Sequence, residues 1–501
     1  MRDKFSWMAK GSRVRWALVC VGGAALAGAI YLITAHITFK IGFPLDDAWI
    51  HQTYARNLIW YGEWSFFPGI SSAGSTSPLW TALLATGYLF TREIPYFWTY
   101  FCGFLALAGI AIAGEAIFRK LVPNPKSRVP WMGLFLVFEW HLVWAAVSGM
   151  ETAWMAMMVL ITLAATLKGG RGVVAAGFLA GISVWVRPDG LTLLGPVVLI
   201  GFLSGSDIET RVKSVGKILA VFLVPFLIYL AFNWVIGGAP WPNTYYAKQA
   251  EYAVLLDQPL ILRIASIMSL PMIGAGILLL PGFVSGIYRS IVERNWMVLT
   301  MALWWVGYSI IYAMRLPLTY QHGRYLIPAM PVFFLLGYWG THTLLESAII
   351  KPRTKRLSQW GFNLAIVGLL AAFLLVGAGA YGKDVAIIET EMVTTANWLT
   401  ENVDSSEVIA VHDIGAIGYF SPHRLIDLAG LITPEITPFI RDEEQLKYYL
   451  DSEDAGYLVT FPGWYPELSK QGIEIFSTGG MFSVEAGGEN MVVYRWVGDG
   501  R

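Results

Sequence analysis

Long apolar stretches recur along most of this chain, and they constrain its fold more than any other feature. A helix needs about 20 mainly apolar residues to cross a bilayer. Charged residues make up only 14% of the 501 residues and hydrophobic residues 56%, whereas soluble domains carry about a quarter charged residues. We therefore expect a polytopic α-helical membrane protein with about eleven spans, near residues 16–38, 95–117, 129–147, 153–167, 172–186, 191–204, 218–236, 264–287, 296–314, 324–346 and 360–381.

The composition also excludes several classes of protein. Lys and Arg together number 35 and so do Asp and Glu, so the net charge is zero and no basic field favours a nucleic-acid partner. The two cysteines, Cys20 and Cys102, lie in apolar stretches and form neither a disulfide framework nor a CxxC metal motif. The 22 Trp and 23 Tyr residues suit aromatic belts that contact membrane lipids at the interfaces.

Basic residues between the spans predict the orientation, because Lys and Arg concentrate on the cytoplasmic side. The stretch 78–90 is apolar but short and follows Pro78, so we expect a dipping helix rather than a span. With that choice every basic cluster falls on one side of the membrane. The prediction is a multi-pass protein of the cytoplasmic (inner) membrane, with a cytoplasmic N-terminus and an external C-terminus. The clusters lie at the N-terminus and near 119–128, 168–171, 211–217, 289–294 and 351–356.

Residues 382–501 differ from the rest of the chain. Charge rises there, apolar runs shorten, and strand-like pieces occur at 407–412, 457–460 and 491–496, after a helical piece at 390–402. These features predict a small α/β domain outside the membrane. We therefore divide the chain into a transmembrane domain, 1–381, and an extracytoplasmic domain, 382–501.

Two adjacent carboxylates, Asp46 and Asp47, follow the first apolar run. Like charges side by side at a membrane surface are costly. The residues after them are apolar at helical spacing, which predicts an amphipathic helix lying flat on the membrane. A helix N-terminus favours carboxylates, so Asp46 is either an N-cap or part of a chemical site, and spacing alone leaves both open.

The other expected external loops carry further polar residues. Glu151 lies in the second loop, and Arg187 and Asp189, which could simply pair, lie in the third. A guanidinium at the depth of Arg324 suits a phosphate, although snorkelling would also place it there. The candidate set gathered on the external side is Asp46, Asp47, His51, Arg56, Glu151, Arg187, Asp189, Asn243, Tyr245, Lys248, His322 and Arg324.

An ordered set of short motifs carries a resemblance to a known family. They are Asp46-Asp47-Ala48, 54–58, 67–69, 76–80, 149–152, 187–190, 242–248 and 322–328, followed by 413–419 and 427–431 in the tail. With these motifs the chain resembles the GT-C glycosyltransferases. It is most similar to the mycobacterial arabinofuranosyltransferases of the AftB type, which take sugars from polyprenyl-phosphate carriers outside the cytoplasmic membrane.

The resemblance implies an inverting transfer from a polyprenyl-phosphate sugar to an extracytoplasmic glycan, lipid or protein acceptor. The acidic motif of the first loop would carry the base, with Asp46 first and Asp47 beside it, and Glu151 would match the second acidic position. Arg324, Lys248 and Arg187 would face the carrier phosphate. The sequence permits a divalent cation near Asp46 and Glu151 without requiring one, and no metal ligand is assigned. Residues 49–53 and 71–76 depart from the family pattern near the acceptor side.

Two other classes of function remain open at this level. One is a secondary transporter or a protein that translocates lipid-linked sugars, with the charges forming its path. The predicted position of those charges in external loops, away from the midplane, argues against it. The other is a non-catalytic sensor or scaffold whose tail binds a partner, and replacing Asp46 distinguishes it from an enzyme.

Overall fold

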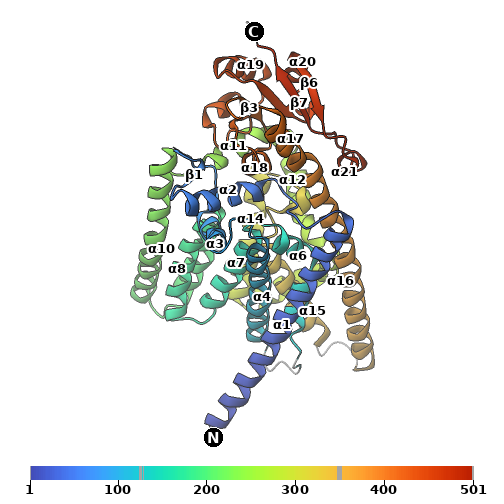
Figure 1. Ribbon diagram of the computed structural model, residues 1–501. Helices are drawn as coiled ribbons and strands as arrows, with labels where there is room; N and C mark the ends of the chain where they lie inside the picture. Colours follow the sequence, from blue (N-terminus) through green and yellow to red (C-terminus); the bar gives the residue numbers. More distant parts are fainter. Residues whose placement is uncertain (1, 123–126, 128, 347–351, 499–501) are drawn as a thin grey trace.

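The computed structural model describes residues 2–122, 127, 129–346 and 352–498. A tall bundle of helices forms most of the molecule, and a small α/β unit sits on one end of it (Figure 1). The N-terminus lies at the other end of the bundle, so the two ends of the chain are far apart.

Six helical segments in the described part of the chain are long and apolar enough to cross a membrane, judged by length and composition. A seventh is a pair of helices, α6 (Trp140–Val147) and α7 (Thr152–Thr166), bent by 120° at the break between them. The protein is therefore a multi-pass helical membrane protein, as predicted. The six segments are Val14–Thr38 within α1 (Arg2–Thr38), α4 (Tyr96–Leu121), α10 (Ile208–Gly237), Ala275–Val292, α14 (Trp296–Arg315) and Thr354–Asn402.

The number of long spans is smaller than the eleven expected, although every expected run is largely helical. The run 129–147 divides into α5 (Trp131–Phe138) and α6 because Glu139 breaks the helix and accepts a hydrogen bond from the amide of Leu142 as an N-cap. The apolar composition of the run does not predict a break in the helix at this residue. Other runs form shorter helices: α8 (Arg171–Val186), η1 (Pro188–Leu193) with α9 (Leu194–Leu203), α12 (Leu260–Ser269) before η3 (Leu270–Met272), η4 (Ala275–Leu279) and α13 (Leu280–Val292), and α15 (Met330–Glu346).

The segment after the first span forms α2 (Asp47–Trp60), the short strands β1 (Ser65–Phe67) and β2 (Ile70–Ser71), and α3 (Pro78–Tyr88). The expected amphipathic surface helix is wrong in its exposure, because the polar side of α2 is buried under α3 and α18 (Ile414–Phe420), and its orientation relative to the membrane stays a prediction. Its polar groups find partners there: Gln52 donates to Thr99 Oγ1, and Asn57 donates to two backbone carbonyls of β1. With 11 residues, α3 is too short to span a bilayer.

The tail contains a five-stranded mixed sheet in the order β4-β3-β5-β7-β6. β3 pairs in parallel with β4 and β5, and β7 pairs antiparallel with β5 and β6. The three expected strands are present, whereas β4 and β6 were not predicted. The strands are β3 (Val408–Val411), β4 (Arg424–Asp427), β5 (Tyr457–Thr460), β6 (Gly472–Ser477) and β7 (Val492–Trp496).

Two connections position the tail. α16 (Pro352–Ile388) continues through a π-helical turn, η6 (Glu389–Val393), into α17 (Thr394–Asn402), so the chain passes residue 381 inside one helix, and the domain boundary proposed there stays a prediction. The carboxyl ends of β3 and β4 face α2, where α18 packs. The remaining elements are α11 (Asn243–Glu251), η2 (Ala253–Asp257), η5 (Gln321–Gly323), η7 (Pro434–Phe439), α19 (Glu443–Ser452), η8 (Pro462–Trp464), α20 (Pro466–Gln471) and α21 (Met481–Glu485).

Candidate active site

Asp47 lies between two cations from distant parts of the chain. Its Oδ2 atom accepts hydrogen bonds from Arg324 Nη2 at 2.6 Å and from Lys248 Nζ at 3.0 Å. Both cations also donate to the hydroxyl of Tyr325, at 3.0 and 3.1 Å. Although burial opposes ionisation, the charges of Lys248 and Arg324 hold the pKa of Asp47 well below its usual range. Asp47 is therefore a carboxylate that fixes two cations in place.

Local backbone structure places those two cations. Lys248 lies in the last turn of α11, a helix held against the first loop because the Asn243 amide donates to the Ala73 carbonyl. Arg324 follows η5, where Gln321, His322 and Gly323 all have positive φ. Left-handed backbone at three consecutive residues, two of them not glycine, marks a tight and strained turn. Such strain is typical of residues that position a functional group.

Asp46 has different surroundings from its neighbour. Its two carboxylate oxygens accept from the amides of Gly415 and Ala416, at 2.6 and 2.8 Å, in the first turn of α18. Asp46 occupies the N-cap position of α2 but makes no side-chain hydrogen bond to that helix, so the N-cap interpretation is right in position and wrong in partner. Burial and the charge of Asp413 raise the pKa of Asp46, although the two amides favour its ionised form.

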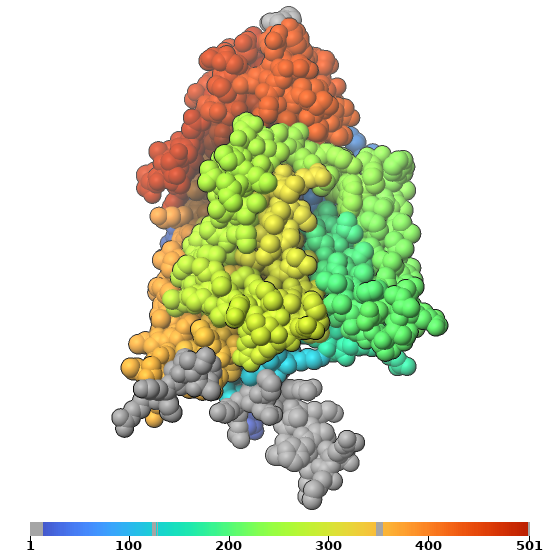
Figure 2. All heavy atoms as spheres, turned by 180° about the vertical axis from the view of Figure 1, so that it is seen from behind, coloured from blue at the N-terminus to red at the C-terminus, as the bar shows by residue number. Residues whose placement is uncertain are grey.

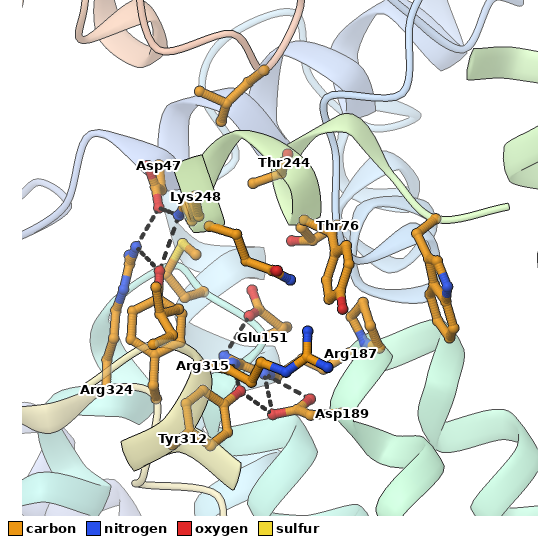
Figure 3. A pocket seen from close by; sticks show the side chains of 18 of the residues that line it. Asp47, Thr76, Glu151, Arg187, Asp189, Thr244, Lys248, Tyr312, Arg315 and Arg324 are labelled. Carbon is orange, nitrogen blue, oxygen red and sulfur yellow. Dashed lines mark hydrogen bonds and ion pairs between the residues drawn. The ribbon is translucent and has the colours of Figure 1, made fainter. Parts of the chain in front are cut away.

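A cavity of about 360 Å³, here called cavity A, opens beside Asp47 (Figure 3). Its polar wall carries Asp47, Lys248, Arg324, Glu151 and Arg187, and the rest is largely apolar, with residues such as Leu191, Trp241, Ile311 and Leu316. On the face shown in Figure 2, a recess lies between the yellow α14 and the green α8–α10 region, just below the tail domain. One wall of cavity A is thus charged, and the rest of its lining is largely apolar.

Glu151 forms the centre of a second group of charges in cavity A. Its Oε1 atom accepts from Arg187 Nη1 at 3.1 Å, and His51 Nε2 lies 3.5 Å from its Oε2 atom. Asp189 accepts from Arg187 Nε at 3.2 Å and from the hydroxyls of Tyr308 and Tyr312, at 2.5 and 2.6 Å. The expected pairing of Arg187 with Asp189 is confirmed. Arg187 is largely neutralised by the two carboxylates, so it supplies less free positive charge than Arg324.

Two more cavities share the acidic pair. Cavity B, of about 660 Å³, is lined by Asp46, Asp47, His322 and Asp384 together with Trp464 and other residues of the tail. Cavity C, of about 490 Å³, is lined by Asp46, Asp47, Lys248 and Arg324 on one side and by tail residues such as His412 on the other. Asp47 therefore lies where all three cavities meet, and Asp46 faces the two between the bundle and the tail domain.

The remaining residues predicted from sequence are placed as follows. Tyr245 lines cavity A. His322 lines cavity B, where its Nε2 atom lies 2.8 Å from Asp384 Oδ2. Arg56 and Asn243 line none of the three cavities: Arg56 donates to the Tyr419 carbonyl and stacks on that ring, and Asn243 is buried at the start of α11. The structure thus brings together ten of the twelve residues around three adjoining cavities and leaves two outside them.

Sequence reasoning missed several residues of these cavities. Arg315, at the end of α14, points into cavity A and has no hydrogen bond or ion pair with any residue that the structure describes (Figure 3). It directly follows an expected span, so a basic residue ending an apolar run was the available signal. Glu251, His412 and Asp413 line cavity C. Their role depends on how the tail docks, which no local pattern reveals.

The described residues contain no group of three or more His, Cys, Asp or Glu side chains placed to hold a metal ion. Each oxygen of Asp46 accepts one backbone amide, and Oδ2 of Asp47 accepts from two cations. Oε1 of Glu151 accepts from Arg187. These three carboxylates are therefore held mainly by cations and amides of the protein itself.

Solved structures of other proteins share the fold of this chain. No curated protein sequence matches the chain significantly. ArnT from Cupriavidus metallidurans, solved bound to undecaprenyl phosphate, superposes with a TM-score of 0.55 at 12% identity, over 97% of this chain and 98% of that one. The archaeal oligosaccharyltransferase AglB from Archaeoglobus fulgidus, solved with an inhibitory peptide and a dolichol-phosphate, gives 0.57 at 12% identity, over 89% of this chain and 69% of that one. The chain therefore has a GT-C-like fold.

This GT-C-like fold extends over nearly the whole chain. Within it, residues 384–494 match a family described as a domain of unknown function (DUF8728). The likeness to the two solved structures is at an identity that shows architecture alone.

Proposed function

We propose that this protein is a membrane glycosyltransferase that moves a sugar from a polyprenyl-phosphate donor to an acceptor hydroxyl on a glycan, lipid or protein. The active site and tail domain would lie on the external face of the cytoplasmic membrane, as the positive-inside argument predicts. The observation that carries the proposal is the pairing of two adjacent carboxylates with a cationic cavity that has an apolar wall.

Cavity A has the chemistry that a lipid phosphate requires. Arg324 uses only Nη2 for its bonds to Asp47 and Tyr325, and its Nε and Nη1 atoms are buried without a partner among the described residues. Buried guanidinium donors without partners are costly, and phosphate oxygens would satisfy them. Lys248 and Arg315 line the same cavity and add charge. Both solved structures named above contain a polyprenyl-type lipid phosphate, which supports the same class of donor here.

The apolar part of cavity A would accommodate the first units of the lipid chain. Leu191, Ile311 and Leu316 line it: Ile311 belongs to the candidate span α14, Leu316 directly follows that helix, and Leu191 lies in η1. A ligand that is anionic at one end and isoprenoid at the other matches a cavity with this division.

Asp46 is the carboxylate best suited to be the base. A base works best when its pKa lies near the working pH, and burial together with Asp413 raises the pKa of Asp46, whereas Lys248 and Arg324 depress that of Asp47. Asp46 lines cavities B and C but not cavity A, and cavity C also contains Lys248 and Arg324, so the proposed base lies close to the cations of the phosphate site. Each carboxylate oxygen that accepts one amide proton retains a second lone pair for a hydroxyl.

The proposed reaction is a single displacement. Asp46 takes the proton of the acceptor hydroxyl while its oxygen bonds to the anomeric carbon, and the bond from that carbon to the phosphate oxygen breaks. Polyprenyl phosphate leaves with the electron pair, and Arg324 and Lys248 neutralise the charge that develops on it. One base suffices and the configuration inverts, in contrast to the two-carboxylate arrangement of glycoside hydrolases.

The test is transfer by the purified full-length protein from a panel of polyprenyl-phosphate sugars, beginning with the arabinofuranosyl donor that the AftB-type resemblance suggests. Wild type is compared with Asp46→Asn and with Asp442→Asn, a matched control because Asp442 caps α19 in the tail and lines none of the three cavities. We expect release of polyprenyl phosphate with one donor, lost in Asp46→Asn and retained in Asp442→Asn. Absence of transfer with every donor and acceptor class would overturn the proposal.

A further inference from the structure

The tail side of cavity C has the composition of a carbohydrate-binding surface. Trp464 and Tyr465 follow one another at the end of η8, and Tyr252 and Tyr320 approach from the helical bundle. Trp464 is 46% exposed, which is unusual for an indole at the edge of an otherwise polar cavity. An exposed aromatic face beside polar groups matches the two sides of a sugar ring, its C–H face and its hydroxyl edge.

Polar groups of cavity C are fixed in a short chain. His412 Nδ1 lies 2.8 Å from the Tyr465 hydroxyl, and His412 Nε2 lies 3.3 Å from Glu251 Oε1. The His412 ring stands edge-on to Trp464, with centroids 4.8 Å apart. These contacts hold a hydrogen-bonding edge and an aromatic face at a fixed relative orientation, which is what discrimination between sugars needs.

Several buried polar atoms of residues that line cavity C lack a partner among the described residues, and one of them is a carboxylate oxygen on the tail side. Asp413 Oδ2 is buried and accepts no hydrogen bond from any described residue. Asp413 directly follows β3, at the carboxyl end of the parallel strands, where ligands of open α/β sheets bind. A buried carboxylate oxygen without a donor is satisfied by a ligand hydroxyl.

The charges of cavity C select the class of ligand. Lys248, Arg324 and Arg441 line it together with His412, and four carboxylates face them: Asp46, Asp47, Glu251 and Asp413. Asp47 is paired with Lys248 and Arg324, and Glu251 is paired with His412, so the cavity carries no large excess of either charge and has little preference for an anionic or a cationic ligand. Since Asp46 and Asp47 line the same cavity, a hydroxyl of the bound ligand reaches the proposed base.

We infer that cavity C is the acceptor subsite and that it binds a neutral glycan, with Trp464 as the stacking platform, Asp413 and Glu251 as hydroxyl partners, and His412 holding Glu251 in place. The role of cavity C as an acceptor subsite rests on the proposed function. The binding of a neutral glycan there does not depend on it. It selects a glycan acceptor over the lipid and protein acceptors that the proposed reaction also allows. Its volume of about 490 Å³ is in the range of small-molecule sites.

The experiment measures glycan binding without catalysis. Full-length protein in detergent is applied to an array of short neutral oligosaccharides of arabinose, mannose, galactose and glucose, together with charged glycans. The variants are Trp464→Ala, Trp464→Phe, and Tyr448→Ala as a control, since Tyr448 is an exposed aromatic of the tail outside all three cavities. We expect binding to neutral glycans that falls at least tenfold in Trp464→Ala and is largely kept in Trp464→Phe and Tyr448→Ala.

The outcomes separate this inference from the proposed reaction. Retention of full glycan binding by Trp464→Ala, or preference for charged glycans, overturns the inference. Absence of glycan binding by a wild-type protein that transfers sugar to a lipid or peptide also overturns it and leaves the glycosyltransferase intact. Glycan binding that depends on Trp464, in a protein without transfer from any donor, supports the subsite and rejects the reaction.

Discussion

Asp46 and Asp47 are neighbours in the chain, yet they face opposite electrostatic surroundings. Asp47 lies against Lys248 and Arg324 on the helical bundle, whereas Asp46 lies against backbone amides and the carboxylate of Asp413 on the tail. One side chain is held ionised by cations and the other has its pKa raised. One acidic pair between the helical bundle and the tail thus presents two different carboxylates, one that holds cations and one whose raised pKa suits the base of the proposed reaction.

The largest effect is expected from removing the guanidinium of Arg324, which lies beside Asp47 on the helical bundle. In Arg324→Gln, Asp47 keeps only Lys248, and the proposed phosphate loses its buried donors. Truncating one partner of a buried charge pair costs about 2–5 kcal/mol, so donor affinity should fall by roughly 30-fold or more. The measurement is equilibrium binding of polyprenyl phosphate. Arg424→Gln, in an exposed pair with Glu453, is the control, and equal loss in both variants would contradict the assignment.

The contact between Asp46 and the tail can also be disrupted by a substitution in the tail, at Gly415. A Cβ atom on Gly415 would lie 2.0 Å from the Asp46 carbonyl oxygen, so Gly415→Ala must displace α18 or α2. We expect a loss of about 1–3 kcal/mol in the free energy of unfolding and a larger loss of activity. The measurement is thermal unfolding in detergent together with transfer activity. Gly216→Ala has open space around its Cβ and should be neutral, and unchanged activity in Gly415→Ala would show that this contact is dispensable.

The raised pKa of Asp46 makes a prediction about pH. Burial raises the pKa of Asp413 to about 6, and its charge above that pH raises the pKa of Asp46. A base must be deprotonated to act, so activity should rise with pH through the pKa of Asp46. In Asp413→Asn the neighbouring charge is gone, so the pKa of Asp46 falls and the rise in activity should occur at lower pH, with the difference from wild type appearing above about pH 6, where Asp413 of the wild type is charged. An unchanged pH profile of kcat would show that ionisation of Asp46 does not control the loss of activity at low pH.

The smallest expected effect concerns Arg315. Its side chain is exposed and has no partner among the described residues, so we expect it to act on the proposed phosphate mainly through its charge. Arg315→Gln should raise the donor KM by about three- to tenfold at low salt, and the difference should shrink as salt screens the charge. A large effect that is insensitive to salt would instead indicate direct contact with the phosphate.

Much of the fold was predictable because it follows from local pattern. Each apolar run is largely helical, and the alternating pieces at 407–412, 457–460 and 491–496 form strands. The strand β6 was missed because four of its six residues, Glu474 among them, are exposed and give it no buried run. Helix breaks such as the one at Glu139 were missed because a single polar residue in an apolar run reads as part of a span.

From the sequence, only those site residues were predictable that lie in loops expected on the external side of the membrane. The external-loop argument named Asp47, Lys248 and Arg324, which the structure joins across 277 positions of the chain. It did not foresee that Asp46 would bond to the tail, since that contact links residues 369 apart and depends on how two units dock. For the same reason His412 and Trp464 carried no local signal of a cavity.

The most direct test of the account compares Asp46→Asn with Asp47→Asn in one preparation, measuring polyprenyl-phosphate binding and the rate of sugar transfer. The account predicts that Asp46→Asn keeps lipid binding near the wild-type value and loses transfer by roughly 10²–10⁴-fold, the usual contribution of a general base. It predicts that Asp47→Asn changes lipid binding as well, because Lys248 and Arg324 lose their anchor. Transfer that survives Asp46→Asn, or substrate flux across proteoliposomes without transfer by the wild type, would contradict it.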